Sequence, residues 1–195
     1  MMAAEELDAD WSLVRVQEAP ALDEYANGYI VRAAGGDYIP AILGRGIDYG
    51  MYKIASWYGL QVTGGSTSVR GTGEYGMRVA GAAAREMLVA AAAARWNVDA
   101  STLTARASRI THSASGRSAT YGELAAAAAA LSVPTSPALK SPEAFTLRRT
   151  SVTRLDVPAK VDGSATYAID VSLPGMLYAA IEMAPVLGGT LQALD

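Results

Sequence analysis

The sequence contains no cysteine and only one histidine, His112. Cysteine thiolates hold structural zinc ions and iron–sulfur clusters, and pairs of cysteines form disulfides. The chain by itself therefore carries none of these groups, and any iron–sulfur cluster must belong to a partner. A single histidine also excludes a histidine-rich metal site.

Large core-filling side chains, basic clusters and long apolar runs are scarce as well. Hydrophobic residues make up 51% of the chain, but much of this fraction is alanine, with one Phe and three Trp, so we expect a thin core. A net charge of −3 without a basic cluster argues against nucleic acid as a partner. No apolar run reaches the roughly 18 to 20 residues of a membrane span, and no export signal is visible at the N-terminus.

The most informative stretch that is present runs from residue 61 to residue 71 and is followed by an alanine-rich helix pattern. Adjacent glycines let a backbone approach a ligand closely, hydroxyls and an arginine supply donors, and a helix N-terminus attracts anions. We therefore predict an anion cradle, a docking place for a phosphorylated or otherwise anionic group, formed by Gly64, Gly65, Ser66, Thr67, Ser68 and Arg70.

Periodicity and turn signals predict a mixed arrangement of helices and strands. Helices are expected at residues 3–8, 74–96 and 121–131, and strands at 12–18, 101–107, 109–112, 165–171 and 176–183. Residues 19–60 read as a long connection rich in Gly and Tyr, with a turn at 44–46, and its aromatic residues are expected to pack onto a neighbouring domain. Residues 132–142 have the composition of a linker, and 173–175 that of a turn.

Three other patterns have competing interpretations. Residues 71–76 satisfy the G-x-G-x-x-G dinucleotide fingerprint, but a polar, glycine-broken segment precedes them where a buried strand is required, so nicotinamide or flavin binding is kept as the rival hypothesis. His112 has the pKa range of a general base but no partner acid, and is interpreted as a packing or surface residue. Glu5, Glu6, Asp8 and Asp10 are interpreted as a solvated face rather than a cation site.

The order of motifs along nearly the whole chain resembles the molybdopterin-binding large subunit of the molybdenum hydroxylases, the xanthine dehydrogenase and aldehyde oxidase superfamily. The likeness is strongest to the branch of isoquinoline 1-oxidoreductase beta subunits and bacterial aldehyde dehydrogenase large subunits. The matching segments are residues 4–11, 63–71, 80–88, 115–117, 121–125, 154–156, 160–163 and 169–177.

This resemblance implies an α+β fold, with a partial molybdopterin-binding domain over residues 1–150 and the start of an α/β hammerhead domain over residues 151–195. It implies that the parent enzyme hydroxylates an aldehyde or an N-heterocycle with oxygen from water. The cofactor would be molybdopterin, as the cytosine dinucleotide, and the cradle would bind it. No catalytic residue or metal ligand is assigned to this chain, which is expected to be inactive alone.

The resemblance also implies the setting in which the chain works. Family members are several times longer and carry a catalytic glutamate near the C-terminus that has no counterpart here, so the chain is interpreted as a fragment. Expected partners are the remainder of the large subunit, a small subunit carrying 2Fe-2S clusters, and a cytochrome c subunit in some assemblies. Family members lie in the periplasm or on the periplasmic face of the inner membrane. A non-catalytic interaction fragment is the remaining alternative.

Overall fold

The computed structural model describes residues 1–17, 19–20, 22–30, 44–61, 69–190 and 192–193. The chain divides into two compact units, Met1–Thr153 and Arg154–Asp195. The first unit contains α1 (Met2–Glu6), η1 (Trp11–Leu13), η2 (Asp23–Tyr25), α3 (Gly44–Trp57), η4 (Val69–Met77), α5 (Arg78–Trp96), η5 (Ala100–Thr102), β1 (Leu103–Arg106), β2 (Arg109–His112), β3 (Arg117–Thr120), α6 (Tyr121–Ala129) and η6 (Pro142–Ala144). The second contains α7 (Val157–Asp162) and η7 (Ala168–Asp170).

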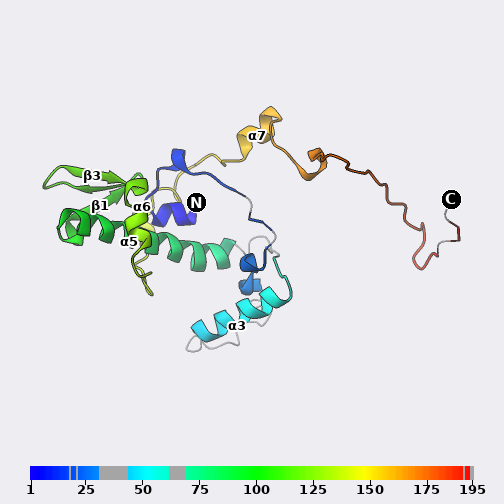
Figure 1. Cartoon of the computed structure of the whole chain (residues 1–195), viewed down its shortest axis with the longest axis horizontal. Coiled ribbons are helices and arrows are strands. Elements are labelled where there is room, and N and C mark those ends of the chain that lie inside the picture. The colour runs from blue at the N-terminus through cyan, green and yellow to red at the C-terminus, as the bar shows by residue number, and fades with distance from the viewer. Residues whose placement is uncertain (18, 21, 31–43, 62–68, 191, 194–195) are drawn as a thin grey trace. The chain divides into compact units, whose positions relative to one another are not determined.

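The core of the first unit lies between α5, α6 and a small sheet, which are neighbours in Figure 1. Seven buried side chains form it, and four of them are alanines, so helix and sheet approach closely but bury little area per residue. Its members are Leu88, Ala91, Ala92, Ile110, Ala119, Leu124 and Ala128. The expectation of a thin, alanine-rich core is confirmed.

The sheet has three antiparallel strands in the order β1-β2-β3. Arg106 pairs with Arg109 across a two-residue turn in which Ala107 and Ser108 have φ angles of 47° and 60°. Positive φ at both positions is the geometry of the type I′ turn, which matches the twist of paired strands. Ser108 also fixes the hairpin to the N-terminal segment, because its N–H donates to Asp8 O and its Oγ accepts from Asp10 N. The predicted hairpin is confirmed.

The two predicted alanine-rich helices are confirmed as well. Asn97 ends α5 in the left-handed conformation, with φ 51°. Thr120 begins α6 with a capping box, in which its hydroxyl accepts from Glu123 N and the Glu123 carboxylate accepts from Thr120 N at 2.7 Å. The helical segment before α5 starts earlier than residue 74, because η4 is a π-helix that continues into it.

Helix α1 packs on α5 at Gly81. A β-carbon at this position would lie 2.5 Å from Ala3 O and 3.0 Å from Glu6 Cβ, so only glycine allows the two backbones to meet this closely. The neighbours Ala82 and Ala83 are also buried. Small residues thus bring the N-terminal acidic segment onto the long helix.

Two predictions for the first 60 residues are wrong. Residues 12–17 form no strand: Trp11–Leu13 is a 3-10 helix capped by Asp10, whose carboxylate accepts from Ser12 N, and the chain then runs extended without a pairing partner among the described residues. The turn predicted at residues 44–46 is instead the start of α3. The sequence of α3 has apolar residues at helical spacing, but it is also rich in glycine and tyrosine. Because these residues are weak helix formers, the pattern did not predict a helix.

The second unit has no strand among its described residues, so the strands predicted at 165–171 and 176–183 are wrong. Alternating sequence makes a strand only when a partner strand satisfies the backbone. The predicted turn is confirmed, since Met176 N donates to Leu173 O at 3.0 Å and Gly175 has φ 76°. Helices with one small sheet agree with the α+β class, whereas the assignment of the units to named domains stays a prediction.

Candidate functional site

Most of the predicted cradle lies outside the described residues. This holds for Gly64, Gly65, Ser66, Thr67 and Ser68, whereas the backbone of Arg70 lies in the first turn of η4. The described part of this region therefore begins at Val69. From there η4 continues into α5, so the helix predicted behind the cradle is present.

The rival dinucleotide fingerprint does not have the required local structure. Residues 71–76 lie inside the π-helix η4, whereas the fingerprint needs a tight turn between a buried strand and a helix. The strands that the structure describes are antiparallel and follow the motif. Gly71 serves packing instead, because a β-carbon there would lie 2.1 Å from the ring of Tyr29. This geometry does not favour nicotinamide or flavin binding at residues 71–76.

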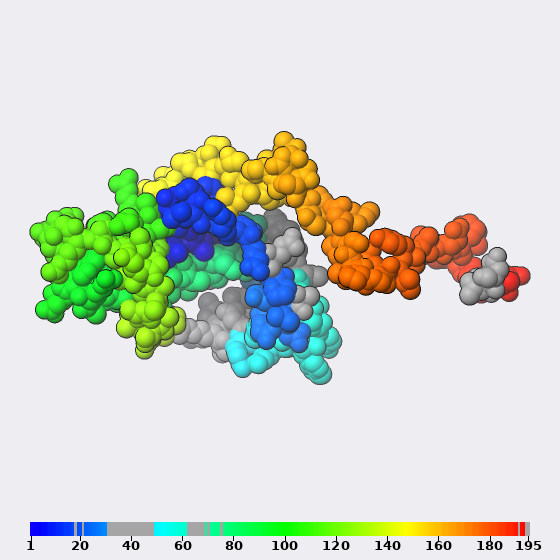
Figure 2. Space-filling model, turned by 45° about the horizontal axis from the view of Figure 1, so that its top comes forward, coloured from blue at the N-terminus to red at the C-terminus, as the bar shows by residue number. Residues whose placement is uncertain are grey.

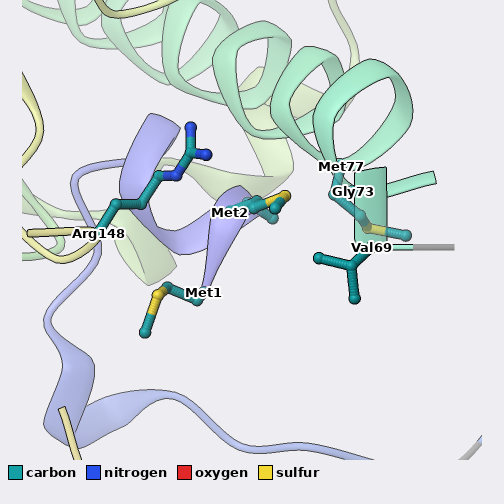
Figure 3. Close-up of a pocket in the computed structure, with 7 residues that line it drawn as sticks. Met1, Met2, Val69, Gly73, Met77 and Arg148 are labelled. Atoms are coloured by element: carbon teal, nitrogen blue, oxygen red, sulfur yellow. The ribbon is translucent and has the colours of Figure 1, made fainter. Parts of the chain in front are cut away.

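A pocket of about 430 Å³ includes in its lining Val69, the first described residue after residues 62–68. Figure 3 shows Met1 and Met2 at the start of α1, with Val69, Gly73 and Met77 of η4 on one side and Arg148 on the other. Its lining is predominantly apolar, and Met1, Val69 and Met77 are each about half exposed, so the pocket is open. Flexible thioether side chains adapt to irregular or flat apolar groups.

Arg148 is the charged side chain of this lining, and it already has partners. It forms an ion pair with Glu74, and its guanidinium lies 4.5 Å from the centre of the Phe145 ring. The pocket floor is therefore close to neutral. A neutral ring or apolar group fits these described residues better than a diphosphate does, because a diphosphate requires several free donors.

Buried carboxylates hold the pocket walls together. Glu6 is 0% exposed, and its carboxylate accepts from Arg78 Nε at 2.7 Å and from Lys140 N at 2.9 Å. Arg78 also pairs with Glu74 at 3.1 Å and donates to Lys140 O at 2.7 Å. This chain of ion pairs links α1, η4, α5 and residues 140–148, and Arg148 joins it through Glu74.

Glu5, which is 1% exposed, also binds the segment of residues 140–148. Its carboxylate accepts from three successive backbone N–H groups, those of Thr146, Leu147 and Arg148, and from Lys140 Nζ at 3.2 Å. Burial raises the pKa of Glu5, but the N–H groups of Thr146, Arg148 and Leu147 and the Lys140 ammonium outweigh it and lower the pKa to about 2.

The interpretation of the acidic run as a solvated face is therefore wrong for Glu5 and Glu6. Lys140 also reaches Asp8 at 2.6 Å, so three of the four acidic residues share basic partners. The partners of Glu5 and Glu6 lie 72 to 143 positions away in the sequence, so no local sequence pattern predicts these contacts. Among the described residues no group of three or more acidic, histidine or cysteine side chains is placed to hold a metal ion.

His112 is a packing residue of β2, as interpreted. Its side chain is largely buried, and Nδ1 lies 2.7 Å from Ser115 Oγ in the turn that precedes β3. Among the described residues the His112 ring has a hydroxyl and not a carboxylate as its partner, so they do not form a triad of an acid, a histidine and a nucleophile.

The pocket residues Met1, Met2, Met77 and Arg148 were not anticipated as a group. Met77 and Gly73 are four positions apart on η4, which is a weak signal that they share a face. The packing of α1 on α5, which brings Met1 and Met2 to the same place, has no local signature except the small residues around Gly81.

The amino-acid sequence was compared with those of known proteins. No family model matches the chain. The isoquinoline 1-oxidoreductase subunit beta of Brevundimonas diminuta is 35% identical over an alignment 225 positions long, which covers 98% of this chain and 25% of that protein. This chain belongs to the molybdenum hydroxylase-like oxidoreductase family. A second member, the membrane-bound aldehyde dehydrogenase [pyrroloquinoline-quinone] of Gluconacetobacter polyoxogenes, is 31% identical over 179 residues, 83% of this chain and 23% of that protein.

This molybdenum hydroxylase-like chain spans about a quarter of the length of the curated relatives that it matches. The similarity extends over both units, since the first alignment covers nearly every residue. None of the helices in the described ranges is both long enough and apolar enough to cross a membrane.

Proposed function

We propose that this chain is the part of a molybdopterin-dependent oxidoreductase large subunit that helps to bind the cofactor. The parent enzyme would hydroxylate an aldehyde or an N-heterocycle with oxygen taken from water. The observation that carries the proposal is the 35% identity to an isoquinoline 1-oxidoreductase subunit beta over 98% of the chain. A molybdenum cofactor would supply the oxygen transfer and accept the electrons.

The chain's own residues would bind and orient this cofactor. Gly64, Gly65, Ser66, Thr67, Ser68 and Arg70 would hold the phosphates of a molybdopterin cytosine dinucleotide. The adjoining pocket would receive a neutral part of the same molecule, because its described lining is apolar and Arg148 is paired with Glu74. The ion pairs from Glu6 to Arg148 would keep η4 in place while the cradle engages the ligand.

The proposal includes other polypeptides. The relative is one subunit of its enzyme, as its name states, and this chain spans a quarter of it. We propose that the remainder of the large subunit, a small subunit with 2Fe-2S clusters and a cytochrome c subunit complete the assembly. A periplasmic or membrane-surface location is part of the same proposal, and the membrane-bound relative supports it.

The test is cofactor content after co-expression with the remaining large-subunit polypeptide and the iron–sulfur subunit. Molybdenum is measured by mass spectrometry and pterin by fluorescence after oxidation of the purified complex. We expect both near one per complex, and a fall of at least tenfold in the Ser66→Ala/Arg70→Ala variant. The matched control is Ser101→Ala, at an exposed position in η5.

The same samples are assayed for pyrroloquinoline quinone, since the second relative is named for that cofactor. Quinone without molybdenum and pterin would reject the proposed cofactor. A bound nicotinamide or flavin would favour the rival hypothesis, and a stable complex that lacks every cofactor would favour an interaction fragment. Equal molybdenum content in the Ser66→Ala/Arg70→Ala variant would remove the cradle assignment while leaving the family unaffected.

A further inference from the structure

Helix α3 has the wrong polarity for a helix that faces water on one side. Its inward side carries Ala55, which is 0% exposed, and the half-buried Met51, Tyr52 and Ser56. A helix of this kind normally places charged and polar residues on the opposite side. Among the side chains of α3 that the structure describes, from Tyr49 to Trp57, the opposite side is mainly aromatic and aliphatic.

We call this outer side the aromatic face, formed by Tyr49, Lys53, Ile54 and Trp57 of α3 and by Tyr58 after it. Tyr49 is 62% exposed, Trp57 84% and Tyr58 69%. Residues 49, 53 and 57 are spaced four apart and therefore lie along one side of the helix. In Figure 2 the cyan atoms of α3 lie on the outer surface of the molecule.

Lys53 is the one cation of the described face, and its ammonium group lies near two tyrosine rings. Lys53 Nζ is 5.4 Å from the centre of the Tyr49 ring and 6.0 Å from that of Tyr52. The rings of Trp57 and Tyr58 are 5.6 Å apart, centre to centre. The face therefore presents exposed aromatic rings at both of its ends and a single positive charge among its side chains.

The aromatic face belongs to a helix that is fixed in its surroundings. Gly28 packs so closely that a β-carbon there would lie 2.8 Å from the Tyr52 backbone, and Asn27 N donates to Leu60 O at 2.8 Å. A fixed helix loses little conformational entropy when a partner covers it, and Trp and Tyr are the residues that most often dominate binding energy in protein interfaces.

We propose that the aromatic face is a docking surface for the polypeptide that supplies the rest of the large subunit. This inference depends on the proposed function, because it takes that polypeptide as the partner. The chain spans 25% of the Brevundimonas diminuta subunit, so three quarters of such a subunit remains to pack against it. With one cation and no carboxylate among its side chains, the face suits an apolar surface with a neutral or acidic rim.

Site-specific photocrosslinking in the native host tests this proposal. The photoreactive residue p-benzoylphenylalanine replaces Trp57 or Tyr49 in the full chain, and Ala126, exposed on α6, in a control. Crosslinked peptides are identified by mass spectrometry. We expect adducts from positions 57 and 49 with a polypeptide similar to the remaining three quarters of the relative, at least tenfold more than from position 126.

Several outcomes would overturn the proposal: adducts with lipid, with a second copy of this chain or with an unrelated protein, no adduct at all, or equal yields from position 126. Binding of the identified polypeptide is then measured with the purified Tyr49→Ser/Trp57→Ser variant, whose fold is checked by circular dichroism. We expect at least tenfold weaker binding, and unchanged binding for Val133→Ser, a matched exposed apolar position. Unchanged binding in the Tyr49→Ser/Trp57→Ser variant would also reject the aromatic face as the docking surface.

Cofactor content of the same complex is measured separately. A complex that forms through the aromatic face without molybdenum or pterin would leave the docking surface standing and reject the cofactor role. If molybdenum and pterin are present in a complex whose formation does not depend on the aromatic face, the cofactor role would stand and the docking surface would be rejected.

Discussion

The carboxylate of Glu5 lies 2.6 Å from the backbone nitrogen of Leu147, a residue 142 positions further along the chain. Thr146 and Arg148 donate their N–H groups to the same carboxylate. One buried side chain therefore satisfies three consecutive backbone donors of a segment without regular hydrogen bonding of its own. This contact holds residues 146–148, and with them Arg148 of the pocket, against α1.

Replacing Glu5 by Gln is expected to destabilise the first unit by roughly 2 to 5 kcal/mol. The amide keeps the size of the side chain but removes the charge, and its NH₂ group faces backbone donors that then lack an acceptor. Urea unfolding followed by circular dichroism measures the loss. Glu24→Gln, on an exposed helix turn, is the control and should change stability by less than about 0.5 kcal/mol. Equal stability of the two variants would contradict the burial of Glu5.

Stability should fall in acid because of the same residue. The pKa of Glu5 is lowered from 4.5 to about 2 in the folded chain. A lowered pKa means that its stabilisation is complete above pH 4.5 and is lost as the pH falls toward 2, on the order of 3 kcal/mol in total. Urea midpoints measured at pH 6, 4 and 3 should decline more steeply for the native chain than for Glu5→Gln. Parallel curves would show that other groups cause the acid dependence.

Gly81→Ala should destabilise the first unit by about 1 to 3 kcal/mol, although alanine favours helices. The added β-carbon would lie 2.5 Å from Ala3 O, which forces α1 away from α5. Gly122→Ala in α6 is the matched control, since its nearest neighbour would be 4.0 Å away, and a neutral to slightly stabilising effect is expected. Thermal unfolding measures both. A stabilised Gly81→Ala variant would mean that α1 does not pack on α5.

Thr120→Ala should cost about 1 kcal/mol by removing one half of the capping box of α6. The Glu123 carboxylate would keep its bond to the backbone N–H of residue 120, so the loss should be partial. Chemical denaturation gives the magnitude, and Thr104→Ala on the edge strand β1 serves as a comparison for general effects of removing a threonine. No difference between the two variants would contradict the cap.

The parts of the fold that depend on residues close together in the sequence could be predicted. The helix that ends at Asn97, the hairpin around Ala107 and Ser108, and the helix that Thr120 begins all have local causes, namely a left-handed cap, a type I′ turn and a capping box. The predictions failed where a strand needed a partner, as at residues 165–171 and 176–183, and where weak helix formers masked α3.

The candidate site divides in the same way. A cofactor loop at residues 64–70 was predicted from glycine and hydroxyl composition and from resemblance, and most of it lies outside the described residues. The pocket lined by Val69 could not be predicted, because Met2, Met77 and Arg148 meet only after α1 has packed on α5. Arg148 lies beyond the predicted linker, and its ion-pair partner Glu74 is 74 positions away in the sequence.

By itself, the amino-acid sequence determined that this chain holds no thiolate-bound metal, that it forms two alanine-rich helices around a hairpin, and that it belongs to the molybdenum hydroxylase-like oxidoreductase family. These properties follow from residue types and from their order. Only the tertiary structure decided that Glu5 and Glu6 are buried rather than solvated and that α3 turns aromatic side chains outward. Both outcomes depend on which distant segments come into contact, because a charge can be buried only where partners from elsewhere in the chain neutralise it.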